Sequence, residues 1–176
     1  MRGPGIRTAW LALTLLPASA AAQSLQPLSL QGLGVYVIRR AEGHDVREND
    51  AHFGLEAQLR YTFSRVSIGV GFQRSTVRAG FIEPRYLVAA GTTTAVYLAG
   101  RVGLASLVCD AGVPCGDQGG ELLLGGGGGV LLRLGDRLSL DLGAQYFTTS
   151  FTPDQTPPDR QRTGWIHTRL GLNVGL

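Results

Sequence analysis

The longest regular feature of the sequence is a strict alternation of apolar and polar residues. From Phe53 to Phe63 every second residue is apolar, and the residues between are polar or glycine. A period of two places successive side chains on opposite faces of a β-strand, whereas a helix needs a period of about 3.6. This segment is therefore predicted to be a strand with one apolar and one polar face.

The same period returns along most of the chain. It predicts eight strands of about ten residues, over 30–39, 53–63, 66–73, 82–88, 96–104, 121–133, 138–146 and 165–176. The inward face of the first strand is ambiguous, because Gly32, Gly34 and Tyr36 compete with Leu33, Val35 and Val37. The connections alternate between long loops, near 41–51, 74–81, 108–120 and 148–163, and short turns, at 64–65, 91–94 and 135–136.

This alternation of connections is typical of an all-β, up-and-down antiparallel transmembrane β-barrel with tight periplasmic turns and longer external loops. Both chain ends then lie on the side of the short turns. A soluble eight-stranded carrier also alternates, but its apolar face points inward. Charged residues make up only 16% of the chain, against about 25% in soluble domains, and this favours the membrane barrel.

Two further observations favour an apolar exterior. The polar faces are rich in glycine, which suits a crowded lumen, and aromatic residues stand near the ends of apolar faces, where an interfacial girdle belongs; these are Phe63, Phe72, Tyr61 and Tyr146. We therefore expect one set of apolar residues to face lipid: Leu55, Leu59, Val70, Leu104, Leu140, Leu142, Leu172 and Val174.

The N-terminal segment has the form of a secretory signal peptide. Arg2 and Arg7 precede an apolar stretch, and small residues at Ala20 and Ala22 predict cleavage before Gln23. The domains are then a signal peptide, 1–22, and one barrel domain, 23–176. No cysteine stands directly after the cleavage site, so a lipid anchor is not expected.

The net charge of the mature chain gives no indication of nucleic-acid binding. All sixteen basic residues are arginines, and removal of two with the signal leaves fourteen against thirteen acidic residues, a net charge of +1. No nucleic-acid partner is expected from such a balance. Because an exported chain meets oxidising conditions, Cys109 and Cys115, which bracket a turn-forming pentapeptide, are predicted to form a local disulfide.

The polar faces carry a set of opposite charges. Seven residues share the polar phase of their strands and are predicted to meet near mid-barrel, namely Glu56, Arg60, Glu83, Arg85, Arg101, Asp141 and Arg169. Isolated charges in a narrow interior would be costly, whereas hydrogen-bonded opposite charges offset much of that cost. We therefore expect an ion-pair network that fills the lumen.

Leu28 to Leu176 resembles the small outer-membrane β-barrel domains of the OmpA/OmpX-like type. The most specific part of the resemblance is the last strand, Arg169 to Leu176. In that family a polar residue, a glycine and two terminal hydrophobic positions form the insertion signal read by the barrel-assembly machinery. The matching residues are Arg169, Gly171, Val174 and Leu176, although the family's final residue is usually aromatic. No peptidoglycan-binding domain is expected after the barrel.

Motifs that carry chemistry are sparse. The run Gly125–Gly129 lacks the residues of a phosphate loop and predicts close packing of backbone. The polar loop residues His44, Asp45, Glu48, Asp50 and His52 match no known metal spacing and indicate a solvated loop. Neither a metal nor a cofactor is expected.

His167 is the best candidate for catalysis, because some small outer-membrane barrels act on lipid A or phospholipid through a serine, a histidine and a carboxylate. Its neighbour is Thr168 rather than serine, and it falls on the lumen phase. The sequence thus favours a monomeric barrel in the outer membrane of a didermic bacterium, with a structural or surface-interaction role. A membrane-embedded lipid-modifying enzyme and a small channel or carrier are the alternatives.

Overall fold

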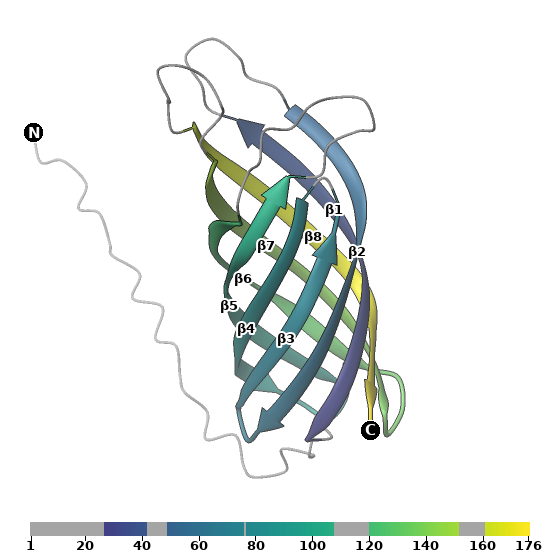
Figure 1. Ribbon diagram of the computed structural model, residues 1–176. Coiled ribbons are helices and arrows are strands. Elements are labelled where there is room, and N and C mark those ends of the chain that lie inside the picture. The colour runs from purple at the N-terminus through teal and green to yellow at the C-terminus, as the bar shows by residue number, and fades with distance from the viewer. Residues whose placement is uncertain (1–26, 42–48, 76, 108–119, 152–160) are drawn as a thin grey trace, which may run out of the picture.

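The computed structural model describes residues 27–41, 49–75, 77–107, 120–151 and 161–176. These residues form a closed barrel in which each strand pairs antiparallel with the next and β1 pairs with β8 (Figure 1). The strands are β1 Leu28–Ala41, β2 Asn49–Phe63, β3 Val66–Arg74, β4 Val77–Ala90, β5 Thr94–Leu107, β6 Glu121–Arg133, β7 Leu138–Phe151 and β8 Gln161–Gly175. The prediction of eight antiparallel strands in a closed barrel is confirmed.

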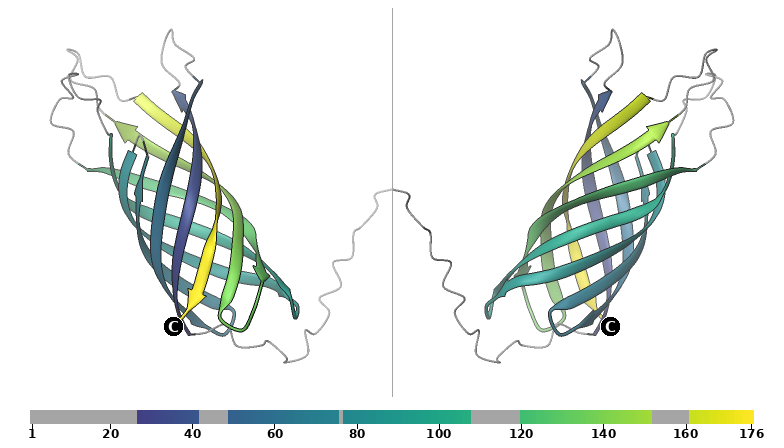
Figure 2. Two further views of the ribbon diagram at one scale, coloured as in Figure 1. Left: turned by 90° about the vertical axis from the view of Figure 1, so that its right-hand side faces the viewer. Right: turned by 90° about the vertical axis from the view of Figure 1, so that its left-hand side faces the viewer.

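Within the described ranges there is no helix of sufficient length and apolarity to cross a membrane. The end of β8 lies at the same end of the barrel as the short β2–β3, β4–β5 and β6–β7 connections (Figures 1 and 2). We call this the turn end. The strands cross the barrel with a marked tilt, which side views show from two directions (Figure 2).

One predicted loop is wrong. The sequence pattern indicates a long connection near 74–81, but β3 ends at Arg74 and β4 begins at Val77. In this part of β4 the apolar residues Val77, Ala79 and Phe81 are buried in the lumen, while Arg78 and Gly80 face outward. The apolar residues here point inward, which is the reverse of the pattern expected for a lipid-facing strand. A pattern of apolar residues on the outer face therefore does not predict this part of β4.

The predicted facing of the apolar residues is confirmed. All eight point outward: Leu55, Leu59, Val70, Leu104, Leu142, Leu172 and Val174 are exposed, and Leu140 is half-buried. Aromatic residues stand at both ends of this apolar surface. Tyr61 and Phe63 lie beside the β2–β3 turn, and the rings of Tyr36 and Phe53 pack 5.0 Å apart near the opposite end.

The lumen is filled by residues of different polarity along the barrel. The half toward the long connections is mostly apolar, with Leu33, Val35, Val37, Val77, Ala79, Ala105, Leu123, Phe147 and Trp165 in one buried cluster. This apolar plug resolves the ambiguity of the first strand, since Leu33, Val35 and Val37 point inward and Gly32, Gly34 and Tyr36 outward. Charged side chains occupy the middle of the lumen, below the plug.

Candidate functional site in the barrel lumen

The seven predicted lumen charges all point into the barrel and lie in one cluster, the charged layer. Because side chains alternate along a strand, residues two or four positions apart share a face, as Glu83 and Arg85 do on β4 and Glu56 and Arg60 on β2. Arg101 comes from β5, Asp141 from β7 and Arg169 from β8. Each of the seven is at most 3% exposed.

Glu83 is the centre of the charged layer. Its carboxylate accepts hydrogen bonds from Arg60 Nη2 at 2.9 Å, Arg85 Nε at 2.7 Å and Arg169 Nη1 at 2.9 Å. Arg101 donates to it as well, through Nε at 2.9 Å and through Nη2. A single buried carboxylate thus binds four guanidinium groups. Each of these hydrogen bonds joins two charged groups and is therefore stronger than a hydrogen bond between neutral groups.

The two other carboxylates of the charged layer, Glu56 and Asp141, also pair with arginines. Glu56 accepts from Arg101 at 2.7 and 3.0 Å, and Asp141 accepts from Arg85 at 2.7 Å. Arg169 lies farther from both, at 3.7 Å from Glu56 and 4.0 Å from Asp141. Four arginines against three carboxylates leave the charged layer with one excess positive charge.

Neutral polar residues complete the network, and sequence reasoning did not assign them to it. Tyr97 donates to Asp141 at 2.6 Å and accepts from Arg169 at 2.7 Å, and Gln145 donates to Glu83 at 3.0 Å. Gln31, Gln58 and Gln73 bond to the arginines. All except Gln31, whose strand has an ambiguous inward face in the sequence, share the polar phase of their strands, which is the signal that could have identified them.

His167 is buried on the lumen side, and its described contacts are a ring and a carboxylate rather than a serine hydroxyl. Its ring packs against Phe147 with centroids 5.1 Å apart, and Nε2 lies 3.9 Å from Glu56. Among the described residues, neither ring nitrogen has a hydrogen-bond partner. A histidine that activates a serine needs that hydroxyl within hydrogen-bond reach, so the described geometry holds no such pair.

The glycine run has the packing role predicted for it. A Cβ at Gly125, Gly127 or Gly129 would collide with backbone and side chains of β7 or with Tyr97. These three glycines are on the inward phase of β6 and leave room for Phe147, Gln145 and Tyr97. Because these three positions on β6 have no side chains, the large residues of the network fit into a narrow barrel.

The predicted insertion-signal residues divide between the two faces of β8. Arg169 belongs to the charged layer, and a Cβ at Gly171 would collide with Leu33 and the Gly32 carbonyl on β1, where the barrel closes. Val174 and Leu176 are exposed on the outside. Their role in insertion remains a prediction.

Several sequence predictions fall on residues that are not described. Cys109 and Cys115, the signal peptide and the loop residues His44, Asp45 and Glu48 lie outside the described ranges. Asp50 and His52 belong to β2. Within the described part of the chain, no three His, Cys, Asp or Glu side chains gather as a group able to hold a metal ion.

No protein-family model matches the sequence, and no curated protein matches it. Solved structures share the fold. The crystal structure of Neisserial surface protein A superposes with a TM-score of 0.71 at 15% identity, covering 85% of this chain and 97% of that one. The outer membrane protein AlkL gives 0.53 at 13% identity, covering 90% and 94%. OprG from Pseudomonas aeruginosa gives 0.51 at 10% identity, covering 84% and 95%.

The chain therefore has the fold of the small eight-stranded outer-membrane β-barrels. Its apolar exterior and charged interior are the reverse of a soluble barrel, so the soluble carrier predicted as an alternative is wrong. The molecule is a transmembrane β-barrel in which the candidate site is the filled lumen.

Pairing within the charged layer can be measured through Arg101, whose partners are Glu56 and Glu83. Arg101→Ala is expected to lower the free energy of unfolding more than the lipid-facing Leu104→Val, which costs about 1 kcal/mol. Arg101→Ala combined with Glu56→Ala should recover part of the loss, with a coupling energy between about 0.5 and 3 kcal/mol. Denaturant titration in detergent micelles measures these three variants and the single variant Glu56→Ala, which the coupling energy requires. Strict additivity would show that the two charges are solvated independently.

Proposed function

We propose that the protein is a monomeric outer-membrane barrel of a didermic bacterium, with a structural or surface-interaction role and a lumen closed to ions. The observation that carries this proposal is the charged layer: seven buried ionisable side chains bonded across the lumen from β2, β4, β5, β7 and β8. Eight-stranded barrels are just wide enough for side chains to fill them, and here the charged layer and the apolar plug fill the lumen from its middle to the end opposite the turns.

The apolar plug supports the same function. An ion that entered from the side of the long connections would meet Val37, Leu123, Phe147 and Trp165 before reaching the charged layer, and the space among them is about 10 Å³. That volume is no more than about one water molecule needs. Two consecutive barriers of different chemistry therefore oppose conduction.

The long connections support the proposed surface role. The proposed orientation places the turn end and both termini in the periplasm, and the three long connections, 42–48, 108–119 and 152–160, outside the cell. A predicted disulfide between Cys109 and Cys115 would lie in the second of these. The proposed partners are outer-membrane lipid and, during insertion, the barrel-assembly machinery. Neisserial surface protein A is, by its name, a surface protein of the same fold.

Planar-bilayer recording tests the closed lumen. The refolded full-length protein is expected to give little or no steady conductance, because both the plug and the charged layer must open for an ion to pass. Heat modifiability on a gel, a shift in migration after boiling, verifies that the sample contains folded barrel. Steady single-channel currents from a heat-modifiable sample would contradict the proposal and make a small channel the leading function.

A further inference from the structure

A cavity of about 540 Å³ opens at the turn end of the barrel, below the charged layer. Its lining includes residues of all three short turns, among them Arg65, Thr93 and Asp136. The volume falls within the range of about 300–1,000 Å³ that is usual for small-molecule sites. We call this space the turn-end cavity.

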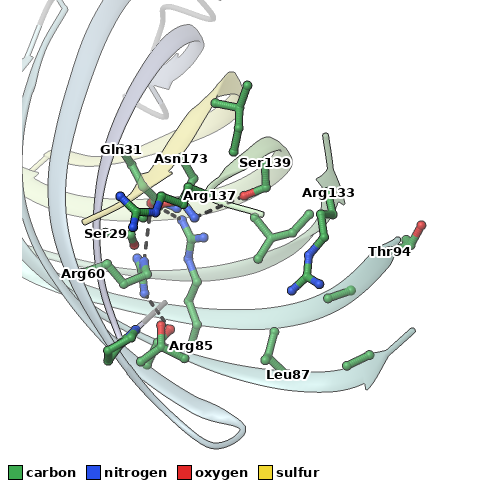
Figure 3. Close-up of a pocket in the computed structure, with 18 of the residues that line it drawn as sticks. Ser29, Gln31, Arg60, Arg85, Leu87, Thr94, Arg133, Arg137, Ser139 and Asn173 are labelled. Carbon is green, nitrogen blue, oxygen red and sulfur yellow. Dashed lines mark hydrogen bonds between the residues drawn. The ribbon is translucent and has the colours of Figure 1, made fainter. Parts of the chain in front are cut away.

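The charge of the lining is strongly one-sided. Five arginines line the cavity against one carboxylate, that of Asp136; the arginines are Arg60, Arg65, Arg85, Arg133 and Arg137. They come from β2, β4, β6 and two different turns. Figure 3 shows Arg60, Arg85, Arg133 and Arg137 around one space.

The inner wall of the cavity is fixed and positive. Arg60 and Arg85 are each 3% exposed and are held by Glu83, while Gln31 bonds to both of them. Because the charged layer has four arginines and three carboxylates, its excess positive charge is not cancelled within the layer. Arg60 has Glu83 as its only carboxylate partner within 4.0 Å among the described residues, and it lies on the cavity side, so the field of the inner wall favours an anion.

The outer wall supplies further donors. Arg133 is the last residue of β6 and Arg137 lies in the β6–β7 turn, and Ser67, Ser139 and Thr94 also line the space. Guanidinium groups and hydroxyls that approach from several directions suit a tetrahedral oxyanion with acceptors on every side. A planar carboxylate presents only two oxygens in one plane and would satisfy fewer of them.

We propose that the turn-end cavity binds a small phosphate-bearing anion, with Arg133 and Arg137 as its principal ligands and the guanidinium groups of Arg60 and Arg85 as a fixed positive floor. The binding does not require an open lumen. The proposal therefore stands or falls separately from the conductance of the barrel.

Isothermal titration calorimetry of the refolded full-length protein in a zwitterionic detergent, with inorganic pyrophosphate at constant ionic strength, tests the proposal. Saturable binding of about one anion per chain is expected. The double variant R133Q/R137Q should raise the Kd at least about tenfold. The matched control is Arg78→Gln, which removes an exposed arginine from the outer face of β4 near the other end and should change the Kd less than about twofold.

Heat modifiability establishes that each variant is folded, and the exposed turn residue Arg137 can be replaced alone if the double variant does not refold. No saturable binding, an unchanged Kd in R133Q/R137Q, or an equal loss in Arg78→Gln would each overturn the proposal. A repeat in nanodiscs identifies the source of the phosphate. If phosphatidylglycerol weakens pyrophosphate binding relative to phosphatidylcholine, the site takes a lipid headgroup; equal binding in both assigns it to a soluble anion.

Discussion

Glu83→Gln is expected to lower the free energy of unfolding by about 3–5 kcal/mol, the usual loss when one partner of a buried ion pair is removed. Glutamine preserves the shape of the side chain, so no cavity forms and the loss comes from the polar interactions of the carboxylate. Four guanidinium groups bond to Glu83 in the native barrel. Without that charge, four arginines would face only Glu56 and Asp141.

The expected loss is at the upper end of this range for a second reason. The amide of glutamine would place donor hydrogens against guanidinium groups that are themselves only donors. Denaturant titration followed by the heat-sensitive gel shift measures the effect, with the same substitution at half-buried Glu121 as the matched control. Losses within about 1 kcal/mol of each other would show that lumen water solvates the charges and that the barrel is wetter than the hydrogen bonds indicate.

The exterior of the barrel could be predicted from the sequence because one solvent acts on all of it. Lipid requires apolar residues at every second position. The period, together with the low charge and the glycine-rich polar faces, therefore assigned Leu55, Leu59 and the other outward residues correctly. The charges of the lumen followed from the opposite phase. Strand number, antiparallel order and the inward phase of the seven charges were therefore all available from the sequence.

The features that could not be predicted from the sequence depend on the lumen, whose polarity changes along the barrel. Where the apolar plug fills the barrel, the inward residues are apolar, which is the reverse of the expected pattern. The start of β4 at Val77 was therefore interpreted as a loop, and the inward face of β1 was left open. Pairings across the lumen depend on strand register and tilt, which the period does not fix. The role of Glu83 as the centre, and the glutamines and Tyr97 that complete the network, consequently appear only in three dimensions.

Gly127→Val is expected to destabilise the barrel by at least about 3 kcal/mol, the upper end of the usual range for overpacking. A Cβ at this position would collide with the Ala144 carbonyl and would lie 2.6 Å from Gln145 Cα, so backbone of β7 rather than a flexible side chain must move. Gln145 also donates to Glu83 at 3.0 Å. Valine at position 127 would thus both separate β6 from β7 and displace Gln145, which donates a hydrogen bond to the charged layer.

Gly80→Val is the matched control, because Gly80 faces outward on β4 and a Cβ there would meet nothing within 4 Å. Its stability should stay within about 0.5 kcal/mol of the natural protein, as is usual for surface substitutions. If Gly127→Val does not refold at all, Gly127→Ala gives a measurable intermediate loss, because its single Cβ meets the same backbone atoms. Equal stability of the Gly127 and Gly80 variants would contradict the packing role of the glycine run, since it would mean that β6 and β7 can move apart without cost to the network between them.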